Sequence, residues 1–256
     1  MSFAATAAWA GANMSGRAET LPESRTVAWP SLDRAKSTNN FAASGWGASA
    51  AMAMGWIETM IRSKVGIQST DAPYHFGPAQ NGGKARTVDE LPLEWFYSGG
   101  VLLDFSGATR FGESISLAEV TAQLDRIAYC VKNGDIVLIR TGAAAHFSDD
   151  PNFTDLSIRL ELAAFLWLLD QGVRVIGCDS ESLDGPTAPM IEALRAGKKE
   201  SFFPIHYAGR EREFCLIHKM DLSALPCAHG FKVVAFPIKL ERCGAAWTRA
   251  VALVAG

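Results

Sequence analysis

The chain has 256 residues and a formal net charge of −3, with 48% hydrophobic and 20% charged residues, a composition typical of a globular protein with a substantial core. This charge balance provides no basic surface, so we expect no nucleic-acid partner. The five cysteines are scattered and include no C-x-x-C pair, which argues against a disulfide framework and favours a reduced, cytoplasmic protein.

The first 50 residues differ in composition from the remainder of the chain. They are rich in Ala, Ser, Gly and Asn with little periodicity, which predicts an irregular N-terminal arm (1–50) before one domain (51–256). The apolar stretch Met1–Ala12 is too short to cross a bilayer. The first basic residue is Arg17, so the stretch does not have the basic start of a signal peptide, and we expect no membrane partner. We also consider a helix near Ala48–Ile61.

The middle of the chain contains a strand followed by a helix–strand unit. Val101–Phe105 is short and apolar, which predicts a buried strand. Ser116 and Glu119 have the spacing of a capping box, which predicts the start of a helix there. Asn133–Gly134 is expected to end this helix, and the β-branched run Asp135–Thr141 predicts the strand that follows.

A second helix–strand unit follows. The broad apolar face of Leu156–Leu169 predicts a helix that Gly172 ends, and Val173–Gly177 predicts another buried strand. The remaining expected elements are a shorter helix at Pro186–Ala196 and strands at Lys232–Leu240 and Thr248–Val254. Alternating helices and strands with strand-rich ends indicate an α/β or α+β domain.

The segment Asp71-Ala72-Pro73-Tyr74-His75 is the first candidate for chemistry. Pro73 disfavours a regular helix interior or central strand, so the segment is expected to be extended and kinked. It would then present a carboxylate that can bind a metal beside an imidazole that can move protons. By spacing alone, the favoured interpretation is a loop in which Asp71 caps a turn and His75 is merely packed.

The same segment carries a family resemblance. It matches the second half of the signature H-x-G-T-H-x-D-x-P-x-H, and the chain resembles the cyclase family of metal-dependent hydrolases, which includes kynurenine formamidases and isatin hydrolases. The two histidines of the first half fall on Val65 and Ser69. Further similar blocks occur in the family's order: Gly82–Lys84, Val88–Trp95, Gly134–Gly142, Gly172–Gly177, Ala208–Glu211 and Gly244–Ala250.

This resemblance implies both a fold and a site. The implied fold is a mixed sheet rolled around a core with helices outside, the swivelling β/β/α arrangement. The implied metal ligands are Asp71, His206 and His218, the last replacing a family glutamate twelve residues after His206. His75 would be the proton-transfer residue, and the bound ion would be Zn²⁺ or Mn²⁺. The resemblance also implies a small-molecule substrate and a homo-oligomeric assembly. Spacing alone favours no shared role for His206 and His218.

Three further residues are candidates for substrate contact. Gln68 and Ser69 could hydrogen-bond a water or a substrate carbonyl in place of the missing histidines, or could be ordinary loop residues. Trp247 could pack against a substrate ring, although core or interface packing is the more frequent role of tryptophan. His146 and His229 are expected at the surface.

Two functions follow from these observations. One is a metal-dependent hydrolase that cleaves a C–N amide bond, in a formamide or a lactam, with His75 moving protons. The other is a homologue with an impaired metal site that keeps the fold and binds a small molecule or a protein partner. The hydrolase rests on Asp71, His75 and His206, and the impaired homologue rests on Val65, Ser69 and His218.

Overall fold

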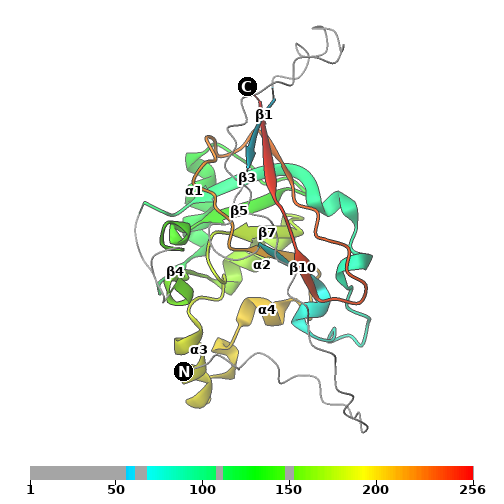
Figure 1. Cartoon of the computed structure of the whole chain (residues 1–256). Helices are drawn as coiled ribbons and strands as arrows, with labels where there is room; N and C mark the ends of the chain where they lie inside the picture. The colour runs from blue at the N-terminus through cyan, green and yellow to red at the C-terminus, as the bar shows by residue number, and fades with distance from the viewer. Residues whose placement is uncertain (1–55, 61–67, 108–111, 148–152, 256) are drawn as a thin grey trace, which may run out of the picture. The chain divides into compact units, whose positions relative to one another are not determined.

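The computed structural model describes residues 56–60, 68–107, 112–147 and 153–255 (Figure 1). The predicted N-terminal arm at residues 1–50 lies outside the described residues, so its boundary with the domain at 51–256 stays a prediction. Among the residues that the structure describes, no helix combines the length and apolarity needed to cross a bilayer.

A mixed sheet of nine strands organises the domain. Its order is β1 (Trp56–Met60), β11 (Val251–Ala255), β9 (Phe231–Val234), β3 (Tyr97–Asp104), β5 (Ile136–Arg140), β7 (Val175–Cys178), β8 (Cys215–His218), β2 (Ser69–Asp71) and β10 (Ala245–Trp247). The four central strands β3, β5, β7 and β8 are parallel, and all flanking pairs are antiparallel. A two-stranded parallel ladder, β4 (Ser114–Ile115) with β6 (Arg159–Leu160), lies outside this sheet.

A short connection shows that the nine-stranded sheet is rolled. β10 is one edge strand and β11 lies next to the other edge, seven strand spacings away, which is roughly 34 Å in a flat sheet. Only residues 248–250 join these two strands, and such a link spans at most about 14 Å. Gln68 reinforces the closure, because its backbone oxygen accepts from the Thr248 amide and its side-chain oxygen accepts from the Ala250 amide. The mixed, rolled sheet expected from the family resemblance is therefore confirmed.

Four α-helices accompany the sheet: α1 (Leu117–Arg126), α2 (Leu162–Asp170), α3 (Thr187–Arg195) and α4 (Pro204–Ala208). The 3₁₀ turns are η1 (Pro73–Phe76), η2 (Val88–Glu90), η3 (Leu93–Phe96), η4 (Ala143–His146), η5 (Phe153–Leu156) and η6 (Lys199–Ser201). Successive residues of β5 enter two cores. Val137 and Ile139 pack with Phe165 of α2, whereas Ile136 and Leu138 pack into the core on the opposite face of the sheet. Burial on both faces explains why the central strands are almost continuously apolar.

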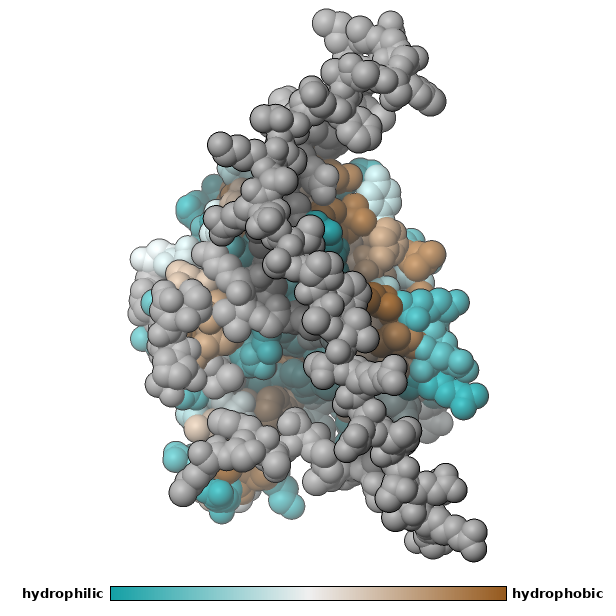
Figure 2. Space-filling model, in the orientation of Figure 1, coloured by the Kyte–Doolittle hydropathy of each residue, from teal (hydrophilic) through white to brown (hydrophobic). Residues whose placement is uncertain are grey.

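Some hydrophobic side chains remain exposed on the described surface. In the view of Figure 2, hydrophobic residues lie beside hydrophilic ones on the same face. The most exposed large apolar side chains include those of Leu93, Tyr74, Trp247, Ile238, Tyr207 and Tyr97. Among these residues, Trp247 lies in β10 of the main sheet.

The predictions of two helices were wrong in part. The helix considered near Ala48–Ile61 is a strand where the structure describes it, because Trp56–Met60 pairs along its length with β11. The helix expected at Leu156–Leu169 begins only at Leu162, because Arg159–Leu160 pairs with β4 and the Leu160 amide donates to the Leu183 carbonyl. In both places, hydrogen bonds to distant segments decide the local conformation.

The capping box at the start of α1 is confirmed. The Ser116 hydroxyl accepts from the Glu119 amide at 3.3 Å, and the Glu119 carboxylate accepts from the Ser116 amide at 2.9 Å. The helix ends at Arg126, before the Asn133–Gly134 pair that was expected to end it.

Removing this cap should destabilise the domain. Ser116→Ala leaves the Glu119 amide without its acceptor, and we expect the free energy of unfolding to fall by about 1 kcal/mol. Urea denaturation measures this change. Ser116→Thr, which keeps a hydroxyl at the same position, is the matched control, and equal losses in both variants would contradict a capping role.

Candidate metal centre

The pairing of two strands brings the first two candidate ligands together. In the antiparallel ladder of β2 and β8, Ser69 lies opposite His218 and Asp71 lies opposite Leu216. Residues opposite one another, and residues two apart on one strand, share a face of the sheet. Asp71 and His218 therefore point to the same side, and His218 Nε2 donates to Asp71 Oδ2 at 3.0 Å.

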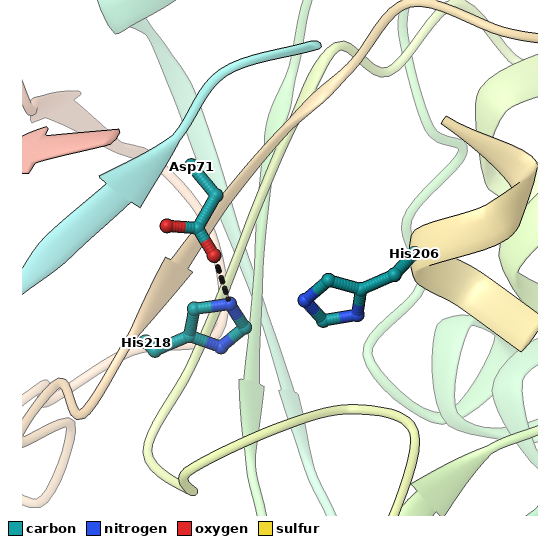
Figure 3. Close-up of side chains that lie close together, drawn as sticks. All are labelled: Asp71, His206 and His218. Atoms are coloured by element: carbon teal, nitrogen blue, oxygen red, sulfur yellow. Dashed lines mark hydrogen bonds and ion pairs between the residues drawn. The ribbon is translucent and has the colours of Figure 1, made fainter. Parts of the chain in front are cut away.

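The third candidate comes from a helix. α4 has five residues with Pro204 at its first position, where proline is well tolerated, and it carries His206. Figure 3 shows the His206 ring facing Asp71 and His218 across a gap. One donor atom from each of Asp71, His206 and His218 lies within 4.8 Å of the other two. The rings of His206 and His218 are parallel within 4°, with centroids 6.1 Å apart.

His75 reaches the same place from the 3₁₀ turn η1. Pro73 begins this turn, and the His75 amide donates to the Ala72 carbonyl, which bends the chain directly after β2. His75 Nε2 lies 3.8 Å from Asp71 Oδ2, and the rings of His75 and His206 have centroids 5.8 Å apart. The His75 side chain is 43% exposed, whereas Asp71 and His218 are buried. The structure thus brings three imidazoles around one carboxylate, with one imidazole open to solvent.

Proximity shifts the charge states of these groups. Burial by itself raises the pKa of Asp71, but its hydrogen bond to His218 and the neighbouring imidazoles lower the pKa below the usual 3.8. Burial by itself lowers the pKa of His218, but its bonds to Asp71 and Cys178 raise the pKa to about 10. Asp71 and His218 therefore form a buried ion pair. The pKa of His75 is lowered, chiefly by burial, with Asp71 opposing and the other two imidazoles adding to the shift.

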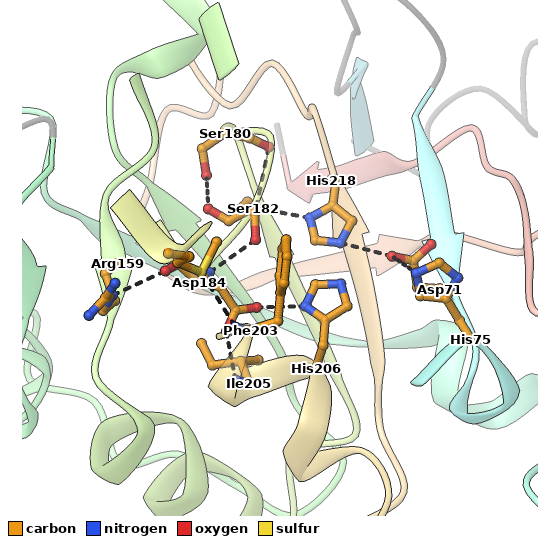
Figure 4. Close-up of polar contacts among 12 residues, drawn as sticks. Asp71, His75, Arg159, Ser180, Ser182, Asp184, Phe203, Ile205, His206 and His218 are labelled. Atoms are coloured by element: carbon orange, nitrogen blue, oxygen red, sulfur yellow. Dashed lines mark hydrogen bonds and ion pairs between the residues drawn. The ribbon is translucent and has the colours of Figure 1, made fainter. Parts of the chain in front are cut away.

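The imidazoles of His206 and His218 each have a second contact behind them. His206 Nδ1 donates to Asp184 Oδ2 at 2.6 Å, as Figure 4 shows, and the Asp184 side chain is fully buried. His218 Nδ1 lies 3.7 Å from Cys178 Sγ. No sequence pattern linked Asp184 to His206. The available signal was its position after a buried strand, where functional loops commonly lie.

The donor set fits a divalent cation. Tetrahedral ligands about 2.0–2.2 Å from one zinc ion lie roughly 3.3–3.6 Å from each other, so the donors of Asp71, His206 and His218 need only a small shift to share an ion. Two imidazole nitrogens and one carboxylate oxygen suit Zn²⁺ and Mn²⁺ and leave positions for water and substrate.

Comparison with known proteins gives the family. The family model Cyclase, described as "Putative cyclase", matches residues 59–185. This part of the chain matches the cyclase family. Comparison with curated protein sequences gives no significant match.

Solved structures of isatin hydrolases have a similar fold. An isatin hydrolase bound to the product analogue thioisatinate is 22% identical, with a TM-score of 0.60 over 74% of this chain and 71% of that chain. Isatin hydrolase A from Labrenzia aggregata, bound to benzyl benzoate, is 20% identical, with a TM-score of 0.59 over 74% and 73% of the two chains. Isatin hydrolase A from Ralstonia solanacearum is 19% identical, with a TM-score of 0.60 over 73% and 71%.

The other predicted site residues divide into two groups. Ser69 lies directly between His218 and Trp247 in the sheet, so these three share the face that carries Asp71. Trp247 is 59% exposed on that face. Gln68 is buried and holds the β10–β11 connection through the Ala250 amide, which is a structural role. Val65 lies outside the described residues.

Two histidines belong elsewhere in the domain. His146 is exposed at the end of η4. His229 is half-buried, its Nε2 lies 3.0 Å from the Ile127 carbonyl, and its ring packs against Tyr129. Neither belongs to the donor group of Asp71, His206 and His218.

The ion pair predicts a pH dependence of stability in the metal-free protein. Because folding raises the pKa of His218 from 6.5 to about 10, protonated His218 favours the folded state. This contribution is fully present below about pH 6.5 and is lost as the pH rises towards 10. We expect the stability difference between wild type and His218→Gln, measured by urea denaturation with a chelator, to shrink across this window. A difference that stays constant from pH 6 to pH 10 would contradict the buried ion pair.

Proposed function

We propose that this chain is a metal-dependent hydrolase that cleaves a C–N amide bond. The observation that carries the proposal is the convergence of Asp71, His206 and His218 from β2, α4 and β8, with His75 beside the shared carboxylate. A divalent ion held there would polarise the amide carbonyl and lower the pKa of a bound water towards about 7.

The protein's own groups would then handle the protons. His75 is exposed to solvent and its pKa is lowered, so its imidazole is largely neutral at pH 7 and can accept a proton from water. It can return that proton to the departing nitrogen, which needs one to leave as an amine. The Asp71 carboxylate, with Oδ2 3.8 Å from His75 Nε2, would stabilise the charged form of that imidazole.

The substrate class we propose is a formamide or a lactam on an aromatic ring. Trp247 presents an exposed indole on the same face of the sheet as the ligands, where it can stack on such a ring. Ser69 lies between Trp247 and His218 and offers a hydroxyl to a substrate carbonyl. Isatin, named in the related hydrolases, is itself a cyclic amide. We further propose that the protein is a cytoplasmic homo-oligomer. A solution mass of one 27.5 kDa chain by light scattering would contradict the homo-oligomer.

Metal content and activity should separate the roles of two histidines. His206→Ala should lose most of the bound Zn²⁺ or Mn²⁺, because it removes a ligand. His75→Ala should keep the metal and lower the turnover of an N-aryl formamide or isatin by about 10²–10⁴-fold. Elemental analysis and steady-state kinetics measure these effects. His229→Ala, whose ring lies against Tyr129, is the matched control. Loss of metal in His75→Ala would contradict its assignment as a proton-transfer residue.

A second function is the impaired homologue, which binds a small molecule or a protein partner without turnover. The observation that favours it is Ser69, which lies on the ligand face opposite His218 where the family resemblance expects an imidazole. If serine in place of histidine at position 69 weakens metal binding, an imidazole restored at that position should strengthen it.

We therefore expect Ser69→His to bind Zn²⁺ or Mn²⁺ more tightly than wild type, as measured by titration calorimetry. Its side chain would leave β2 on the face that carries Asp71 and His218. Ser69→Phe, a ring of similar size without nitrogen, controls for steric effects. Wild-type protein that already holds one ion per chain and turns over an amide at about 1–10³ s⁻¹ would rule out the impaired homologue.

A further inference from the structure

The segment that runs from the end of β7 to the start of α3 contacts the imidazoles of His206 and His218 from behind. Cys178, at the end of β7, faces His218 Nδ1, and Asp184, six residues later, faces His206 Nδ1. Both rings therefore present Nδ1 to this segment, and His218 directs its Nε2 to Asp71. Figure 3 shows one ring nitrogen of His206 directed towards Asp71 and His218.

We propose that Asp184 is a positioning residue that fixes the tautomer of His206. A carboxylate accepts hydrogen bonds and cannot donate one, so its contact with Nδ1 requires a proton on that nitrogen. Nε2 of the neutral ring is then the nitrogen with the free lone pair, and it faces the cation site. The proposal rests on the proposed metal site and adds the residue that prepares one of its ligands.

Asp184 is itself held in place from three directions. Its Oδ1 accepts from the Ile205 amide at 2.6 Å, in the first turn of α4. Its backbone amide donates to Ser182 Oγ at 3.0 Å, and its carbonyl accepts from Arg159 Nε at 3.1 Å (Figure 4). One carboxylate thus binds both the start of α4 and the imidazole one residue further along that helix. This arrangement fixes the position of His206 as well as its tautomer.

Cys178 provides an internal comparison. A thiol sulfur is a weak acceptor, and its 3.7 Å contact with His218 Nδ1 is long compared with the 2.6 Å bond from His206 to Asp184. His218 is also held by its position in a buried strand, whereas His206 stands on a helix of five residues. Asp184 should therefore contribute more to metal binding than Cys178 does.

Asparagine at position 184 tests the tautomer directly. An amide has one acceptor oxygen, and the buried Ile205 amide, as a donor, requires that oxygen. The amide NH₂ would then face His206 Nδ1 and donate to it, which moves the imidazole proton to Nε2. A protonated Nε2 has no lone pair for a cation. Asp184→Ala, by contrast, leaves the two tautomers free to interconvert.

The experiment uses the full chain with ¹⁵N-labelled histidine. In metal-free wild type, ring ¹⁵N shifts should show His206 with its proton on Nδ1, and in Asp184→Asn they should show it on Nε2. Titration calorimetry with Zn²⁺ should give a 10–100-fold loss of affinity for Asp184→Asn and a smaller loss for Cys178→Ala. Asp179→Asn is the matched control, because Asp179 is a buried carboxylate of the same segment that bonds to Thr141 and Gly142.

The outcomes separate this inference from the proposed function. An unchanged His206 tautomer in a folded Asp184→Asn variant would overturn the inference, as would equal losses of affinity in Asp184→Asn and Asp179→Asn. Wild-type protein that binds no Zn²⁺ or Mn²⁺ would overturn the proposed function, whereas the tautomer measurement on metal-free protein would still decide the role of Asp184.

Discussion

The antiparallel pairing of β2 with β8 is the interaction on which the site depends. It joins Asp71 to His218 across 147 residues of chain. A slip of one residue in this register would turn Asp71 to the opposite face of the sheet. The pairing in turn depends on the rolled sheet, because residues 248–250 must connect β10, beside β2, to β11, which lies next to the far edge strand β1. The buried Gln68 joins these features, since it immediately precedes β2 and bonds to both ends of that connection.

Charge is balanced within this small group. A buried carboxylate without a partner would be costly, and His218 supplies that partner by donating from Nε2. A cation bound at the same donors would take the place of that proton, so the ion pair keeps the ligands close together before metal arrives. His75 remains outside the ion pair and open to solvent, which keeps it available to exchange protons.

The hydrogen bonds of Asp184 explain why the short helix α4 can carry a metal ligand. Five residues of α4 have little intrinsic stability as a helix, and Asp184 anchors both the first turn and the His206 ring. Preorganisation of this kind holds donors close to a productive geometry without help from the ion. The chain departs from the family signature at Val65 and Ser69, and from the family's ligand set at His218. Asp71 and His75 are nevertheless retained, and His206 is anchored by a buried carboxylate.

The sequence alone determined the fold class, the capping box at Ser116 and the main strands, because these follow from local periodicity and hydrogen-bonding chemistry. The family motif also named the residues that the structure brings together around Asp71. Tertiary structure decided where local patterns compete with distant partners. Trp56–Met60 became a strand by pairing with β11, and Arg159–Leu160 paired with β4 instead of joining a helix. It also decided that Gln68 closes the sheet and that Asp184 bonds to His206, because these contacts join segments whose separation no local pattern records.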